Sequence, residues 1–305
     1  MSSQIAITAR NLGSLTLDKY CSRCLWYLLR MKFHPPFDSF GAGIFYALEK
    51  SEKAVIGHFL ESDGCLPKEF APFCDCVARV DYPTHWSKFR YEHESGIVLY
   101  GACDDIFRLK DGTLCVCDHK TAKNKGADDP FHGQYEVQVV GYSNIAEIGL
   151  ELGTVSRGVL MYWEVQLADF LDDVSSHYRQ KTMYVPFVPK PLEVTIDYSI
   201  LDPLLEEVNK VWESGVPPDG REGCTDCKKL DLLFAIEQEV ESQDAYMLKM
   251  FGTFRDTRNE IMGRAFRRRT RRRCALEELS LSAEGLFSSD GLAANWEFLE
   301  SEVEY

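Results

Sequence analysis

Two short apolar segments joined by a tight-turn signal constrain the fold of this 305-residue chain more than any other feature. Residues 104–109 and 113–118 read as paired strands, because the Lys110-Asp-Gly112 sequence is typical of a β-hairpin. Another apolar run, residues 97–102, comes immediately before them. Residues 134–151 then place apolar side chains at helical spacing. Strands followed by such a helix predict a domain of the α/β class.

The hairpin carries acidic side chains, Asp104 and Asp118, at the ends of its strands. The turn brings these ends together, and two neighbouring carboxylates repel each other unless they share a cation. Lys120 lies on the same face as Asp118, since side chains alternate along a strand. Such a group suits a divalent metal ion that activates water beside a phosphodiester, with the lysine assisting. An isolated Asp-x-Lys sequence is more often an ordinary solvated loop, so the assignment depends on the accompanying residues.

The accompanying residues occur in an ordered set. They are Gly101-Ala-Cys-Asp104, Asp111-Gly112, Leu114-Cys-Val-Cys-Asp118-His-Lys120-Thr121 and Gln138-Val-Val-Gly-Tyr142. This order resembles the PD-(D/E)XK nuclease superfamily in its RecB-like branch. The resemblance implies a restriction-endonuclease-like α/β core, in which helices flank a central mixed β-sheet. It also implies exonuclease-like, Mg²⁺- or Mn²⁺-dependent hydrolysis of DNA phosphodiester bonds, in DNA repair or recombination, CRISPR adaptation or phage DNA processing.

The resemblance also assigns roles to individual residues. The metal ligands would be Asp104, Asp118 and the backbone carbonyl of His119, and the catalytic lysine would be Lys120. Gln138 and Tyr142 would face the site together, because residues four apart lie on one side of a helix.

A third side-chain ligand is expected from an N-terminal helix over residues 40–62, where relatives often carry a histidine. Glu49, Glu52 and His58 are the candidates, with Glu52 favoured because a carboxylate suits magnesium. Without this ligand, metal binding would be weak. The alternative function is therefore a catalytically weak or inactive nuclease-fold module that serves as a nucleic-acid-binding or assembly partner.

Two Cys-x-x-Cys pairs, Cys21/Cys24 and Cys224/Cys227, bracket the predicted core. Four thiolates suit either a tetrahedral zinc site or a four-iron cluster. The CRISPR-adaptation and AddB-type exonucleases, which the chain resembles, hold an iron–sulfur cluster with one cysteine before the core and three after it. Here the division is two and two, so an iron–sulfur cluster and Zn²⁺ both remain open. Four unconnected buried thiols are the simpler alternative.

Composition excludes some classes of protein. The chain has no run of about 18 apolar residues, so no membrane helix is predicted. Its first ten residues lack the pattern of a secretory leader, and a cytoplasmic or nucleoid-associated protein of bacterial or phage type is expected. The net charge of −14 argues against a non-specific nucleic-acid coat protein, although a metal-dependent site is itself acidic. DNA, as single strands or duplex ends, is the expected partner through the resemblance alone.

The nuclease-like domain is expected to span residues 10–232, with a charged extension over residues 233–305. Residues 255–273 carry nine arginines, and residues 274–305 carry eight acidic residues but no lysine or arginine. The arginines either bind phosphate groups or are neutralised by the acidic segment. The extension is also a candidate surface for a protein partner.

The remaining expected elements are helices over residues 14–33 and 200–213 and strands over residues 159–165 and 181–188. Lys123 and Lys125 follow Lys120 closely. They are therefore better candidates for lining a substrate groove than the arginines of residues 255–273.

Overall fold

The computed structural model describes residues 4–31, 43–71, 73, 75–236 and 238. By their contacts, the residues divide into two compact units, Met1–Leu230 and Asp231–Tyr305. The first unit contains every helix and strand that carries a label in this article. The arginine-rich and acidic segments expected over residues 255–305 lie outside the described residues.

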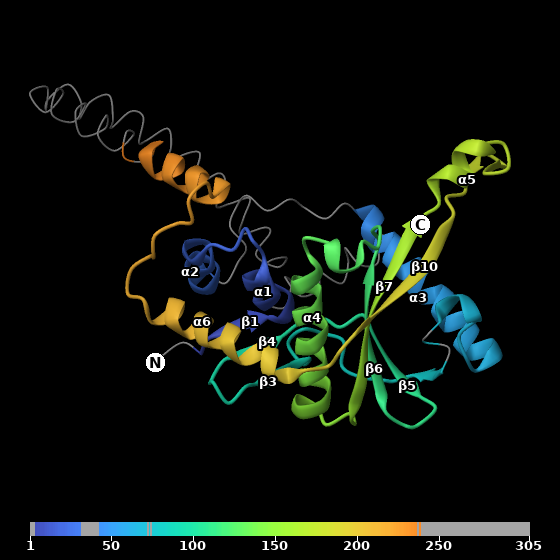
Figure 1. The fold of residues 1–305 in the computed structure, drawn as a ribbon, viewed down its shortest axis with the longest axis horizontal. Helices are drawn as coiled ribbons and strands as arrows, with labels where there is room; N and C mark the ends of the chain where they lie inside the picture. Colours follow the sequence, from blue (N-terminus) through green and yellow to red (C-terminus); the bar gives the residue numbers. More distant parts are fainter. Residues whose placement is uncertain (1–3, 32–42, 72, 74, 237, 239–305) are drawn as a thin grey trace, which may run out of the picture. The chain divides into compact units, whose positions relative to one another are not determined.

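A five-stranded mixed sheet forms the centre of the first unit (Figure 1). Its strands lie in the order β10 (Phe187–Val194), β7 (Val155–Val165), β6 (Leu114–Lys120), β5 (Asp105–Leu109) and β2 (Cys76–Arg79). Strands β6 and β7 are parallel, and the other neighbouring pairs are antiparallel. The predicted hairpin is β5–β6, in which Asp105 pairs with Cys117. Asp104 therefore precedes β5 at the sheet end where Asp118 lies.

Helices cover both faces of this sheet. Helix α4 (His132–Asn144), which continues into a π-helical turn at Ile145–Gly149, packs against β6 and β7. Helix α3 (Gly43–Asp63) contributes Ile56 and Leu60 to the core on the opposite face. This arrangement confirms the predicted α/β class, a central mixed sheet flanked by helices. Within the described residues, none of the helices is long and apolar enough to cross a membrane.

Successive residues of β6 belong to two different cores. Leu114 and Val116 join the core under α4, and Cys115 and Cys117 join the core under α3. The same alternation along the strand directs Asp118 toward α4 and the next side chain, His119, toward α3. The strand thus delivers neighbouring polar side chains to opposite sides of the sheet.

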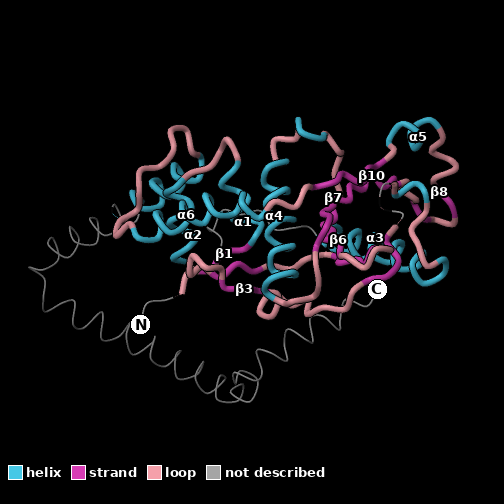
Figure 2. Tube along the Cα trace, turned by 60° about the horizontal axis from the view of Figure 1, so that its bottom comes forward, coloured by secondary structure: helices cyan, strands magenta, loops and turns pink. Residues whose placement is uncertain are grey.

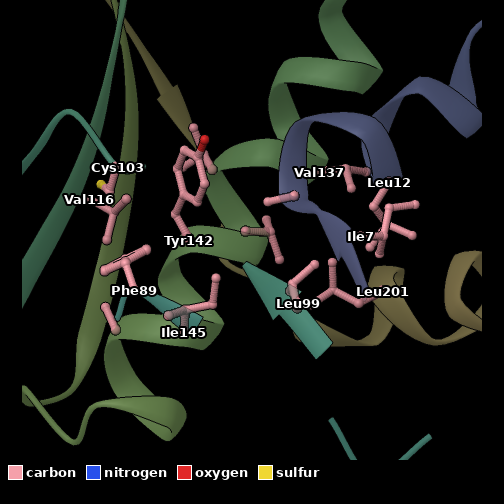
Figure 3. Close-up of a cluster of buried hydrophobic side chains, with 14 of the residues drawn as sticks. Ile7, Leu12, Phe89, Leu99, Cys103, Val116, Val137, Tyr142, Ile145 and Leu201 are labelled. Carbon is pink, nitrogen blue, oxygen red and sulfur yellow. The ribbon is translucent and has the colours of Figure 1, made fainter. Parts of the chain in front are cut away.

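A smaller sheet and further helices pack on the outer side of α4. The sheet has the order β1 (Ala6–Thr8), β4 (Val98–Tyr100) and β3 (Arg90–Glu92), and the helices are α1 (Ala9–Gly13), α2 (Ser22–Met31) and α6 (Leu201–Glu213). Both views of the chain place α1 beside α4, on the side away from β6 and β7 (Figures 1 and 2). Figure 3 shows the shared core, in which Leu99, Tyr142 and Leu201 point into one apolar cluster.

Some expected elements differ in the structure. The helix expected over residues 14–33 is interrupted, because Leu17 adopts extended backbone angles and α2 begins only at Ser22. The apolar run 97–102 is not continuous with β5, since β4 belongs to the smaller sheet. The strand expected over residues 181–188 is divided as well: a two-residue hairpin strand, β9 (Thr182–Met183), pairs with β8 (Tyr178–Arg179), and β10 starts after Pro186. The helix expected over residues 200–213 is α6.

Candidate functional site

The C-terminal end of β6 and one face of α4 meet in a chain of hydrogen bonds. Gln138 Nε2 donates to Asp118 Oδ1 at 3.0 Å and to the Tyr142 hydroxyl at 3.1 Å. Lys120 Nζ donates to Gln138 Oε1 at 3.1 Å and lies 2.5 Å from Asp118 Oδ2. The ammonium group also lies 4.2 Å from the centre of the Tyr135 ring, a cation–π contact. These contacts fix Lys120 from several sides, and they bring together four of the residues expected in the site.

Tyr142 reaches this network because residue 101 is a glycine. A Cβ atom at Gly101 would lie 2.3 Å from Tyr142 Cε1, closer than any side chain allows. The ring is buried, and it packs edge-on against Phe89 with centroids 5.9 Å apart. The glycine of the Gly-x-x-Asp sequence therefore makes space for the tyrosine of the helix.

Asp104 is held from two directions. Its Oδ2 accepts the backbone N–H of His119 at 2.8 Å, and its Oδ1 accepts a hydrogen bond from Lys53 Nζ at 3.1 Å. Lys53, on α3, also pairs with Glu49 one helical turn earlier, at 2.5 Å. The side chain of Asp104 keeps 18% of its surface exposed. Asp104 is thus oriented by the backbone of β6 and neutralised by a lysine of α3.

Glu52 of α3 is the candidate third ligand that lies in the site. It is 5% exposed, and its Oε1 accepts a hydrogen bond from the Thr121 hydroxyl at 2.9 Å. Its Oε2 is buried without a hydrogen-bond partner among the described residues. Glu49 instead pairs with Lys53, and His58 is exposed beside Phe59. Glu52 Oε2 lies 3.9 Å from His119 Nδ1, which is too far for a hydrogen bond. A buried carboxylate oxygen without a hydrogen bond is costly, and a cation would reduce that cost.

The carboxylates influence one another's charge. Burial raises the pKa of Asp118, Lys120 opposes that rise, and the negative charge of Asp104 adds to it. Burial also raises the pKa of Glu52, while the Thr121 hydrogen bond lowers it and the charge of Asp104 raises it further. Asp104 therefore lies within electrostatic range of both buried acids. A divalent cation among them would favour the ionised form of all three.

The oxygen-rich donor set fits Mg²⁺ or Mn²⁺ in kind, since these ions prefer carboxylate oxygens. It does not close around one point in the described residues, because the ligand oxygens of Asp104, Asp118 and Glu52 are not all within 4.8 Å of one another. Lys53 and Lys120 balance the negative charge of this arrangement. A metal ion held by Asp104, Asp118 and Glu52 would supply positive charge of the kind that Lys53 and Lys120 supply in this structure.

The opposite face of β6 carries a second buried network, which the sequence analysis missed. Trp163 Nε1 donates to His119 Nδ1 at 2.9 Å, so His119 Nε2 carries the proton and donates to Asp105 Oδ2 at 3.1 Å. Asp105 in turn pairs with Arg79 Nε at 2.6 Å. The His119 side chain is thereby directed toward Asp105 and toward Glu52, whose Oε2 lies 3.9 Å from His119 Nδ1, while its backbone N–H binds Asp104. The adjacent acids Asp104 and Asp105 could have indicated this network, because side chains that alternate along a strand point to different faces of the sheet.

The four cysteines predicted to form a staple come together. Cys21 Sγ lies 3.5 Å from Cys227 Sγ, and Cys24 Sγ lies 3.6 Å from Cys224 Sγ and 3.7 Å from Cys227 Sγ. All four sulfur atoms lie within 4.8 Å of one another, so the group can hold a metal ion. The first cysteine of each pair lies just before a helix, α2 or residues 225–236, and the second lies in its first turn.

The surroundings of the cysteines favour a bound ion. Burial alone would raise the pKa of Cys21, but the Arg221 N–H at 3.3 Å and the Cys24 N–H outweigh it, and the pKa falls to about 7. Burial raises the pKa of Cys227 to about 12. Cys21 therefore ionises more readily than Cys227. A cation bound by all four sulfur atoms would favour the thiolate form of each.

Comparison with known proteins gives limited information. No family model and no curated protein matches the chain. The similar solved structures include a protein named SSO0001, with a TM-score of 0.34 and 14% identity over 70% of this chain and 80% of that chain. They also include an alkaline exonuclease, LHK-Exo, from Laribacter hongkongensis, with a TM-score of 0.33 and 12% identity over 81% of this chain and 97% of that chain. Structural similarities with TM-scores this low say nothing about function. A functional proposal must therefore rest on the side chains described above.

Proposed function

We propose that this chain is a metal-dependent nuclease that hydrolyses DNA phosphodiester bonds. The observation that supports the proposal best is the group of polar contacts at the end of β6. Asp118 pairs there with Lys120 and Gln138, Asp104 accepts the backbone N–H of His119, and Glu52 accepts the Thr121 hydroxyl. The expected ligands of Mg²⁺ or Mn²⁺ are these three carboxylates and the carbonyl oxygen of His119. When bound, such an ion would make water a stronger nucleophile and stabilise negative charge on the phosphate.

The protein's own residues would position the substrate and the charges around it. Lys120 keeps its ammonium group near the phosphate position, because Gln138, Asp118 and the Tyr135 ring hold it. There it would stabilise the charge that develops on the phosphate. Lys123 and Lys125, both exposed in the loop after β6, would attract the adjoining phosphate groups. The preference for DNA over RNA rests on the sequence resemblance.

The test is hydrolysis of linear DNA by the purified protein with Mg²⁺ or Mn²⁺. We expect Asp118→Asn and Lys120→Ala to lower the rate at least about a hundred-fold, as loss of a charged group in an active site commonly does. Lys110→Ala is the matched control, because Lys110 is an exposed lysine at the opposite end of β6. Closed circular DNA should resist an exonuclease. Equal rates for Lys120→Ala and wild type would refute the assignment and favour a non-catalytic nucleic-acid-binding or assembly module.

We infer that the four cysteines hold a single Zn²⁺ ion rather than an iron–sulfur cluster. Four ligands at the Zn–S distance of about 2.3 Å place neighbouring sulfur atoms about 3.8 Å apart in a regular tetrahedron. The separations of 3.5–3.7 Å are close to this value. In a four-iron cluster each thiolate binds a different iron atom, so the sulfur atoms stand further apart.

Metal analysis of the purified protein tests this inference. We expect about one zinc per chain, no iron-dependent visible absorption, and loss of the zinc in Cys24→Ser. The control is Cys65→Ser, because Cys65 is a half-buried cysteine outside the cluster. Melting temperature gives a second measurement, which should fall on removal of the zinc. Stoichiometric iron with brown colour would overturn the inference.

A further inference from the structure

An apolar groove of about 600 Å³ lies between α3 and the strands β7 and β10. Aromatic side chains form much of its lining. Phe70 and Trp163 are nearly buried and meet edge to face with centroids 6.0 Å apart, and Phe59 packs on Phe70 at 6.5 Å. Val55 of α3 also lines the groove and is 41% exposed. This size and lining are typical of a pocket for a small, flat organic group.

The groove has the wrong charge for a phosphate. Among the described residues that line it, the charged ones are Glu52 and Glu69, both carboxylates. The remaining polar side chain is the hydroxyl of Ser51. An uncharged, flat group with hydrogen-bond donors on its edge matches these walls, because carboxylate oxygens accept hydrogen bonds and the aromatic rings provide apolar contact. A nucleobase has this chemistry, whereas the sugar–phosphate backbone does not.

Two residues connect the groove to the candidate metal site. Glu52 lines the groove, and its buried Oε2 has no hydrogen-bond partner in the described part of the chain. Trp163 also lines the groove, while its Nε1 donates to the side chain of His119 between Asp118 and Lys120. A group seated in the groove would therefore contact Glu52 directly, and through Trp163 it would contact the His119 side chain, which lies 3.9 Å from Glu52 Oε2.

We propose that the groove binds the base of the terminal nucleotide next to the bond to be cut. The proposal rests on the proposed nuclease function and adds a substrate class to it, a DNA end with an intact terminal base. Holding that base beside Glu52 would set the distance between the strand end and the scissile phosphate. The enzyme would then require a base at the strand end. The apolar walls of the groove would discriminate little between the four bases.

The test compares binding of short DNA duplexes that differ only in having an intact or an abasic nucleotide at the 5′ or the 3′ end. Binding is measured by fluorescence anisotropy in the Lys120→Ala protein with Mg²⁺, so that hydrolysis does not interfere. Stacking of one base commonly contributes about 1–3 kcal/mol. We therefore expect one of the two abasic ends to bind about 5- to 150-fold more weakly than the intact end.

Val55→Trp, which fills the groove, should abolish this discrimination by weakening the intact end alone. Val55→Ala, which leaves the groove open, should keep it. Ile148→Trp adds the same side chain at another exposed apolar position. It should leave the discrimination seen in the Lys120→Ala protein unchanged. Equal affinity for all ends, or unchanged discrimination in Val55→Trp, would overturn the proposal and point to another occupant such as an apolar protein segment. If the ends are discriminated in the binding assay but the wild-type protein hydrolyses no DNA, the proposed nuclease function fails while the base-binding groove stands.

Discussion

Single residues decide how the two halves of the site approach each other. Gly101 and Tyr142 lie in different parts of the fold, yet the Tyr142 ring occupies the space that a side chain at residue 101 would fill. The Tyr142 hydroxyl then accepts a hydrogen bond from Gln138, which also binds Asp118. A change at Gly101, which itself bears no functional group, would thus reach Asp118, the proposed metal ligand, through two side chains.

Gly101→Ala tests this coupling. The new methyl group would overlap the Tyr142 ring, and overpacking of this kind commonly costs about 1–3 kcal/mol of unfolding free energy. We expect a lower melting temperature together with a lower nuclease rate, because Tyr142 must move and Gln138 with it. Gly43→Ala is the control, since a Cβ at Gly43 meets nothing within 4 Å. Combining Gly101→Ala with Tyr142→Leu should cost less than the sum of the two changes, and strict additivity would argue against direct overlap.

Strand β6 shows at the scale of elements why the sequence was informative here. The hairpin and the strand alternation are local properties, and they predicted correctly that Lys120 lies on the side of Asp118. The same alternation places Cys115 and Cys117 together on the other face of β6, where both are buried. The expected spacing of Gln138 and Tyr142 on one face of α4 is seen in their hydrogen bond. These features need no information about distant parts of the chain.

Other contacts depend on long-range packing, which local patterns do not encode. The position of α3 against the sheet selects Glu52 over Glu49 and His58, and it brings Lys53 to Asp104. The network of Trp163, His119, Asp105 and Arg79 joins four strands and was not anticipated. The burial of aromatic residues also depends on this packing, since Tyr162 and Trp163 are buried whereas Trp86 is 56% exposed. The roles of the site residues stay predictions until activity is measured.

The buried acids affect the stability of the whole molecule. The pKa values of Glu52 and Asp118 are raised above the ordinary carboxyl range near about 4, chiefly by burial. In metal-free protein the folded state therefore holds these protons at pH values where the unfolded chain has released them. Their contribution to stability is greatest at low pH and declines as the pH rises from about 4 toward the raised values, above which it is constant.

Melting temperatures from pH 4 to pH 8 should reveal this decline as a difference between wild type and Glu52→Gln. Because the amide carries no charge, we expect Glu52→Gln to gain stability relative to metal-free wild type as the pH rises. Saturating Mg²⁺ should reverse the order at pH 8, since the ion stabilises ionised Glu52 in the wild type. A wild-type advantage at pH 8 without metal would contradict the assignment of Glu52 as a costly buried charge.

The four-cysteine cluster ties the order of synthesis to the completion of the fold. Cys24 and Cys224 are 200 residues apart, so the N-terminal pair is made long before its partners exist. During that interval the thiols of Cys21 and Cys24 are available to bind a wrong metal or to oxidise. Binding of the proposed zinc ion would then be the last cross-link formed in the unit, and a chain truncated before Cys224 would carry an incomplete site. Zinc content would in this way report how many molecules in a preparation have folded from end to end.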